Sequence, residues 1–168
     1  MTADMNSAST LYWEDFAAGS VAEYGPYMVT KEEIIDFACQ FDPQPMHLDE
    51  EAARHSMLKG LGASGFHTCG ILMRLIADGF VNKCASQGSP GVDEVKWRAP
   101  VRPGDELRVR ATITETRVSN SRPDMGFIKF RFEMLNASDT CVMTLVSSLM
   151  VGRRSRSAAT GNATRSGG

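Results

Sequence analysis

A chain of 168 residues is long enough for one domain with a sizeable hydrophobic core. Its formal net charge of −2 gives no sign of the basic surface that nucleic-acid-binding proteins use. No apolar run approaches the ~20 residues of a membrane-spanning helix, so we expect no nucleic acid and no membrane as partners.

The four cysteines, Cys39, Cys69, Cys84 and Cys141, are widely spaced and form no C-x-x-C pair. This spacing is not typical of a zinc site, so no metal is expected. Most of the cysteines have apolar neighbours, where a free thiol behaves as a small hydrophobic side chain. A reduced, cytoplasmic setting is the simplest interpretation.

Both ends of the chain differ in composition from its middle. Residues 1–10 are small and polar and lack the basic and apolar segments of a secretory signal, so we expect a mobile leader. Residues 153–168 are rich in Ser, Gly, Ala, Thr and Arg, which favours a disordered tail. The single domain should therefore span residues 11–152.

The first half of the domain is expected to be mainly helical. A strand over about residues 21–29 precedes a capping box at Thr30 and Glu33, and the helix that begins there should end at Pro43. Residues 48–56 predict a second, short helix, and residues 59–65 a glycine-rich turn. The longest helical pattern, from about residue 67 to 84, is apolar enough for a well-buried helix.

After Pro90 the apolar residues recur every second position, which indicates strands. Four strands are expected, around residues 95–99, 107–113, 128–134 and 141–151, and alternation of this kind is typical of an antiparallel sheet. The order of elements predicts an α+β fold in which a curved antiparallel sheet covers one buried helix.

An acid and an imidazole lie five residues apart in the segment that follows the first helix. This segment reads Asp42-Pro43-Gln44-Pro45-Met46-His47. Each proline fixes its own φ and disfavours helix at the residue before it, so we expect a stiff, extended loop to present both side chains. A carboxylate and an imidazole held together form a general acid/base pair, and histidine titrates closest to neutral pH.

The segment resembles the D-x-N-P-x-H signature of the MaoC-like, or (R)-specific enoyl-CoA hydratase, family. The Asp, the second Pro and the His match in place, whereas Gln44 stands where the family has Asn. A second patch, Ala63-Ser64-Gly65-Phe66-His67-Thr68, is similar to the small-residue turn before the family's central helix. The resemblance extends from about Tyr12 to Gly152, and it implies a single hotdog fold that pairs into a homodimer.

The resemblance also implies the chemistry of the site. Asp42 and His47 are the expected catalytic residues, and an acyl-CoA thioester is the expected substrate, with coenzyme A as part of that substrate and no separate cofactor. Free N–H groups near His67 and Thr68, at the start of the central helix, should bind the thioester oxygen as it gains charge, and Gly65 should let the backbone approach closely. The expected substrate-binding residues are Gln44, Gly65, Phe66, His67 and Thr68.

The expected activity is reversible addition of water to the 2,3-double bond of an enoyl-CoA, which gives an (R)-3-hydroxyacyl-CoA. One alternative is a hotdog acyl-CoA thioesterase, which needs only a carboxylate-activated water. Another is a non-catalytic acyl-thioester-binding protein, which the departures at Gln44 and Thr68 leave open. His55 is interpreted as a surface residue, and Lys96, Arg98 and Arg102 as parts of a charged outer sheet face.

Overall fold

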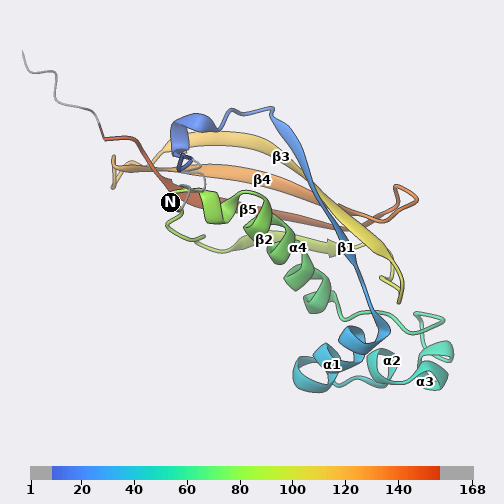
Figure 1. Ribbon diagram of the computed structural model, residues 1–168. Coiled ribbons are helices and arrows are strands. Elements are labelled where there is room, and N and C mark those ends of the chain that lie inside the picture. Colours follow the sequence, from blue (N-terminus) through green and yellow to red (C-terminus); the bar gives the residue numbers. More distant parts are fainter. Residues whose placement is uncertain (1–8, 156–168) are drawn as a thin grey trace, which may run out of the picture.

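The computed structural model describes residues 9–155 of the chain (Figure 1). Five strands form one antiparallel sheet in the order β1-β3-β4-β5-β2. The strands are β1 (Val21–Met28), β2 (Val92–Trp97), β3 (Glu106–Val118), β4 (Met125–Leu135) and β5 (Cys141–Gly152). The helices are α1 (Lys31–Phe41), α2 (Pro45–Leu48), α3 (Glu50–Arg54) and α4 (Gly65–Gly79), and the short 3-10 turns are η1 (Trp13–Asp15) and η2 (Val81–Lys83).

The expected alternation of buried and exposed side chains is present in the inner strands β3 and β4. Leu107, Val109, Ala111 and Ile113 of β3 are buried, as are Ile128, Phe130, Phe132 and Met134 of β4. The alternating residues of β2 are not buried in this way: Val95 is partly covered and Trp97 is half exposed. The difference arises because β2 is an edge strand, paired with β5 alone.

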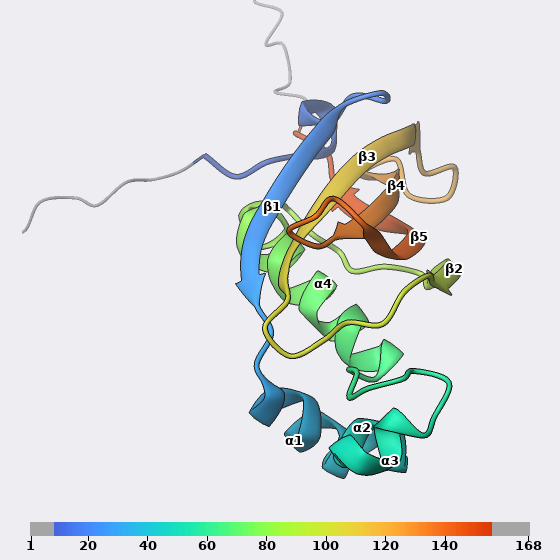
Figure 2. The same cartoon turned by 90° about the vertical axis from the view of Figure 1, so that its right-hand side faces the viewer.

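The sheet curves around α4, which crosses one of its faces (Figures 1 and 2). The helix buries Ile71, Leu72, Leu75 and Ile76 in the same hydrophobic cluster as the inward residues of β3 and β4. An α+β fold with a curved antiparallel sheet around one long helix was the expectation from sequence, and it is confirmed. Within residues 9–155, no helix is long and apolar enough to cross a membrane.

The helices α1, α2 and α3 gather beside the N-terminal end of α4, beyond the C-terminal end of β1 (Figure 2). Thr30 caps α1 as expected, because its Oγ1 accepts a hydrogen bond from the N–H of Glu33 at 3.2 Å. The short helix expected over residues 48–56 is present as α3, although it begins at Glu50 and not at Leu48. Asp49 has extended φ and ψ and separates α2 from α3, and its carboxylate caps α3 by accepting from the N–H of Ala52 at 2.8 Å.

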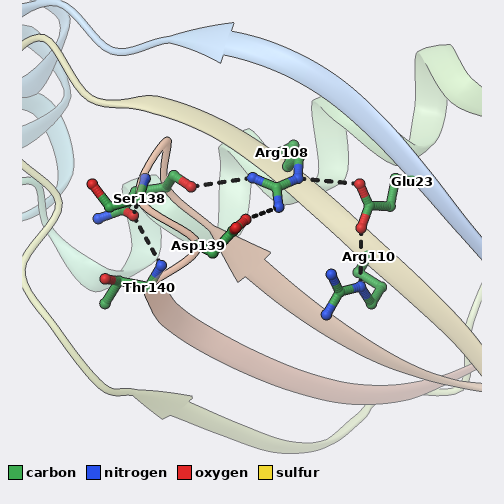
Figure 3. Close-up of polar contacts among 7 residues, drawn as sticks. Glu23, Arg108, Arg110, Ser138, Asp139 and Thr140 are labelled. Carbon is green, nitrogen blue, oxygen red and sulfur yellow. Dashed lines mark hydrogen bonds and ion pairs between the residues drawn. The ribbon is translucent and has the colours of Figure 1, made fainter.

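A network of charged side chains holds the edge strand β1 to the rest of the sheet (Figure 3). Arg108 of β3 donates to Glu23 of β1 at 3.1 Å and also to Asp139 in the β4–β5 turn. Arg110 donates to the other oxygen of Glu23 at 2.9 Å. The turn is held by Asn136, whose Oδ1 accepts from the N–H groups of Ser138 and Thr140, both at 3.0 Å. These contacts hold the end of the sheet together. None of their side chains lines the cavity beside Asp42 and His47.

Most of the predicted leader and tail, residues 1–8 and 156–168, lies outside the described residues. The first two residues assigned to the tail do make contacts with η1. Arg154 Nη2 donates to Asp15 at 2.7 Å, and Arg153 Nε lies 3.4 Å from Glu14. The contacts of the domain therefore continue past residue 152.

Candidate active site

Asp42 lies at the C-terminal end of α1, where the following proline stops the helix. Its Oδ1 accepts a hydrogen bond from Gln44 Nε2 at 2.6 Å, and its Oδ2 accepts one from Ser64 Oγ at 2.7 Å. These two donors lower the pKa of Asp42 below its ordinary value, and the nearby His47 ring contributes in the same direction. Asp42 is therefore an ionised carboxylate at neutral pH.

His47 belongs to the one-turn helix α2, so the expectation of a purely extended loop is wrong for this residue. Pro45 occupies the first turn of α2, a position where proline is favoured because its missing N–H would have no partner inside the helix. The imidazole Nδ1 lies 2.7 Å from the carbonyl oxygen of Gly62. A carbonyl only accepts, so Nδ1 carries a hydrogen, and in the neutral ring Nε2 is the nitrogen without one.

Nε2 of the His47 ring faces the carboxylate of Asp42. His47 Nε2 lies 3.5 Å from Asp42 Oδ2, and the two side chains are 7% and 19% exposed. This separation is long for a direct hydrogen bond, and both atoms can contact one small molecule such as water. The structure therefore brings together the acid and the imidazole that the sequence placed five residues apart.

The N-terminal turn of α4 is the third component of the site. Ser64 is the N-cap, and its Oγ accepts from the N–H of Phe66 at 3.3 Å while it donates to Asp42. Within residues 9–155, the N–H groups of Gly65 and His67 make no hydrogen bond. The N–H of Thr68 does: it donates to the carbonyl of Ser64 at 3.1 Å. The expectation of a free N–H at Thr68 is therefore wrong, and Gly65 and His67 supply the free donors.

The absence of a side chain at Gly65 makes room for Trp97 of the edge strand β2. A Cβ at this position would lie 2.4 Å from the Trp97 ring, closer than atoms approach without displacement. Trp97 Nε1 donates to the carbonyl oxygen of Gly65 at 3.0 Å, and the indole meets the Phe66 ring edge-on at 5.6 Å. Gly65 is therefore required because the indole of Trp97 lies against it. The bond from Trp97 fixes the start of α4 from the side of the sheet.

Asp42, His47 and the start of α4 open onto a cavity of about 550 Å³. Its wall is predominantly apolar, as expected of a small-molecule site with a few polar groups. Besides Asp42, Gln44, His47, Gly65, Phe66 and Thr68, the lining residues are Met46, Met57, Leu58, Ala63, Trp97, Arg98, Ala99, Pro100, Val101 and Val142.

His67 is the one expected binding residue whose side chain is absent from this lining. Its ring is buried against α1, and only its backbone N–H belongs to the turn beside the cavity. Of the basic residues, Arg98 lines the cavity, whereas Arg102 donates to the carbonyls of residues 58, 60 and 61 and holds the loop before α4. His55 is exposed, as expected.

Three contributors to the site were not identified from the sequence. Ser64 lay in the small-residue patch but was assigned no role, Gly62 offers only a backbone carbonyl, and Trp97 lay in the strand expected around residues 95–99 without a role in the site. The serine before a long apolar helix is a recognisable N-cap signal, and it was the one local clue to Ser64. Gly62 and Trp97 act through tertiary contacts that no local pattern encodes.

The acid–imidazole pair lines a cavity in a hotdog fold, and comparison with known sequences gives the family of the chain. The model of the MaoC-like domain matches residues 16–132. The chain therefore belongs to the MaoC-like domain family. It is also 29% identical over 141 residues to YdeM, an uncharacterised protein of Bacillus subtilis (strain 168), with 83% of this chain and 98% of YdeM covered.

Solved structures agree with this assignment. A MaoC-like dehydratase from Rhodospirillum rubrum is 41% identical, with a TM-score of 0.81 over 86% of this chain and 99% of that one. The unliganded R-hydratase PhaJ1 from Pseudomonas aeruginosa has a TM-score of 0.66 at 20% identity, over 86% of this chain and 88% of the other. The second likeness shows a shared fold, and both support the hotdog architecture.

Proposed function

We propose that this protein is an enoyl-thioester hydratase that adds water reversibly across a 2,3-double bond, giving an (R)-3-hydroxyacyl product. The observation that carries the proposal is the 3.5 Å approach of His47 Nε2 to Asp42 Oδ2, beside the free N–H groups of α4. Membership of the MaoC-like family and the fold shared with an R-hydratase support this class of reaction.

Asp42 and His47 would divide the proton transfers between them. A water held by both side chains attacks C3 of the substrate and gives a proton to the Asp42 carboxylate. His47, protonated on Nε2, supplies a proton to C2. The proton then returns from Asp42 to His47 through the next water, and the net change is addition of H and OH to the double bond.

The thioester carbonyl oxygen gains negative charge as C3 is attacked. The N–H groups of Gly65 and His67 lie at the positive end of α4 and are free to donate to it. Donors that are fixed in advance stabilise a developing charge more than the ground state.

None of these steps uses a metal or a redox cofactor. Coenzyme A enters as part of the substrate, and a cytoplasmic location, inferred from the free cysteines, completes the proposal.

A second copy of the chain is the proposed partner. Phe66 and Trp97 are 67% and 50% exposed although both line the cavity, and Met73 of α4 and Val92 of β2 are 49% and 57% exposed. Exposed apolar residues beside an unpaired strand edge are typical of an interface. Sedimentation should therefore show a homodimer or an even multiple of it, and a species of only the 18.3 kDa monomer mass at micromolar concentration would contradict this part of the proposal.

An absorbance assay of enoyl-thioester loss tests the activity. Crotonyl-, octenoyl- and branched enoyl-CoA should be compared, with free thiol measured in the same reactions. Loss of the conjugated double bond without thiol release supports the hydratase. Thiol release from acyl-CoA without hydration would show that the protein is a thioesterase. Binding without either reaction would indicate a non-catalytic protein.

A further inference from the structure

His67 is buried on the side of α4 that faces away from the cavity. Its side chain is 10% exposed and its Nε2 lies 3.3 Å from Oε1 of Glu33 in α1. The imidazole stacks on the ring of Phe37, with centroids 4.9 Å apart and planes 9° apart. Glu33 and Phe37 are one turn apart on α1, so one side chain of α4 makes a polar and an aromatic contact with the same face of that helix.

The carboxylate that meets His67 is itself held from two directions. Tyr27 of β1 donates its hydroxyl hydrogen to Glu33 Oε1 at 3.1 Å, and Thr30 Oγ1 lies 3.3 Å from Oε2. Glu33 was expected to cap α1 by reaching back to its backbone. It instead joins β1, α1 and α4, and these contacts leave its side chain only 26% exposed.

The ionisation of His67 follows from these neighbours. A carboxylate accepts, so Nε2 carries the hydrogen, whereas Nδ1 is buried without a partner among the described residues. Burial lowers the pKa of His67, and the charge of Glu33 opposes this change in part. Glu33 from α1 and, behind it, Tyr27 from β1 are the titratable groups that face the ring, and Arg74 of α4 lies near Tyr27.

The first turn of α4 is therefore attached to α1 at two points. Ser64 donates to Asp42 at the C-terminal end of α1, and three residues later His67 contacts Glu33 near its N-terminal end. The free N–H groups of Gly65 and His67 lie in the segment between these two contacts, residues 64–67. A rotation of α4 about its axis would move those N–H groups relative to Asp42 and His47. Trp97 restrains this turn from the side of the sheet, and Ser64 and His67 restrain it from the side of α1.

We propose that His67 is a positioning residue: its contact with Glu33 fixes the first turn of α4 so that the N–H groups meet the thioester oxygen in the transition state. This inference rests on the proposed hydratase activity. The His67 side chain does not contact the substrate and transfers no proton. Glu33 acts on the site only through its contact with His67.

The test compares His67→Phe with the wild-type protein. The phenylalanine keeps a ring to stack on Phe37 and removes the donor to Glu33. The kcat for enoyl-CoA hydration should fall about tenfold, with KM changed by less than about twofold, because the N–H groups act mainly on the transition state. His67→Gln, which keeps an N–H that can reach Glu33, should recover most of the lost kcat.

Two further variants separate positioning from folding. His55→Phe makes the same change at an exposed residue of the protein and should leave kcat unchanged. Glu33→Leu removes the other partner, and the double variant with His67→Phe should be little worse than either single one, because both remove the same contact. If His67→Phe lowers the melting temperature too far for assay, the kcat of His67→Gln and of Glu33→Leu decides the question.

The outcomes distinguish this inference from the function on which it rests. A wild-type protein that hydrates no enoyl-thioester overturns both. A wild-type enzyme that is inactivated by Asp42→Asn but keeps full kcat in His67→Phe overturns the positioning role alone. A loss of kcat in His67→Phe that His67→Gln does not recover would also overturn it, because the Nε2–H donor would then not be the feature that matters.

Discussion

Ser64 Oγ lies 2.7 Å from Asp42 Oδ2, so the hydroxyl that caps α4 also holds the carboxylate at the end of α1. One serine therefore links the proposed proton acceptor to the proposed carbonyl-binding turn. Ser64 is fully buried, and its Oγ has no competing contact with solvent. A change at Ser64 should alter both the ionisation of Asp42 and its distance from α4.

Ser64→Ala should lower kcat/KM for hydration about tenfold, which corresponds to ~1.4 kcal/mol. The pKa of Asp42 is below its ordinary value chiefly because Gln44 and Ser64 donate to the carboxylate. Loss of one donor raises that pKa, so the acidic limb of the kcat/KM profile should move to higher pH. Ser56→Ala is the matched control, because it removes a local hydroxyl bond to Ala53 without touching Asp42, and its profile should not move.

The same bond predicts the direction of a stability change. A carboxylate whose pKa is lowered in the folded state stabilises the protein above its ordinary pKa, and this stabilisation is lost as the pH falls through the folded value. Ser64→Ala should bring the pKa of Asp42 in the folded protein closer to its pKa in the unfolded chain. The melting temperature of Ser64→Ala should therefore depend less on pH in the acidic range than that of the wild type, and an equal dependence would argue against the bond.

Asp42→Asn and His47→Gln should each lower hydratase kcat by ~10² or more. The asparagine keeps the shape of the side chain but cannot accept the proton, and the glutamine cannot titrate near neutral pH. Because both positions act on one water, the double variant should be little worse than either single one. Melting curves check that the variants fold, and a fully active Asp42→Asn would show the proposed mechanism to be wrong.

Gly65→Ala should destabilise the protein by about 1–3 kcal/mol and reduce hydration, because the new Cβ would lie 2.4 Å from the Trp97 ring. The effect should depend on the indole. In a Trp97→Ala background the same substitution meets no ring, and alanine is a better helix former than glycine, so Gly65→Ala should then be neutral or stabilising. Thermal unfolding of the four proteins measures this change of sign, and an equal loss in both backgrounds would contradict it.

Cys84 should be the slowest of the partly buried thiols to react with an alkylating reagent at pH 8. Burial, with the charge of Asp15 second, raises the pKa of Cys84 to about 11, and its thiol donates to the carbonyl of Phe80. The thiolate is the nucleophile, so its rate should rise about tenfold per pH unit until that value is approached. Exposed Cys39 should supply the fast phase, which Cys39→Ser should remove and Cys84→Ser should leave.

The strands and the acid–imidazole pair could be predicted because their signals are local. Alternation marked the inward residues of β3 and β4, and two prolines between Asp42 and His47 indicated a rigid connection. The prolines were interpreted as preventing helix throughout the segment. Pro45 instead begins α2, because the first turn of a helix tolerates a residue without an N–H.

The contacts that complete the site could not be predicted from local patterns. Ser64 meets Asp42 across 22 residues of chain, and Trp97 meets Gly65 across 32. Both depend on how α4 crosses α1 and the edge strand, which hydrophobic periodicity does not specify. His67 illustrates the same limit: the sequence indicated a role for its backbone N–H at the start of α4, but not the contact of its side chain with Glu33.

The Nδ1 bond of His47 to the Gly62 carbonyl has a consequence for the fate of the substrate's hydrogen. Nδ1 keeps its hydrogen, because the carbonyl has none to exchange, and a proton that arrives on Nε2 has no second route through the ring. Only Nε2 of the imidazole can therefore exchange a proton. A deuteron removed from C2 during dehydration must leave by the side from which it came, so the rate at which the label is lost to bulk water reports how freely solvent enters the cavity during turnover.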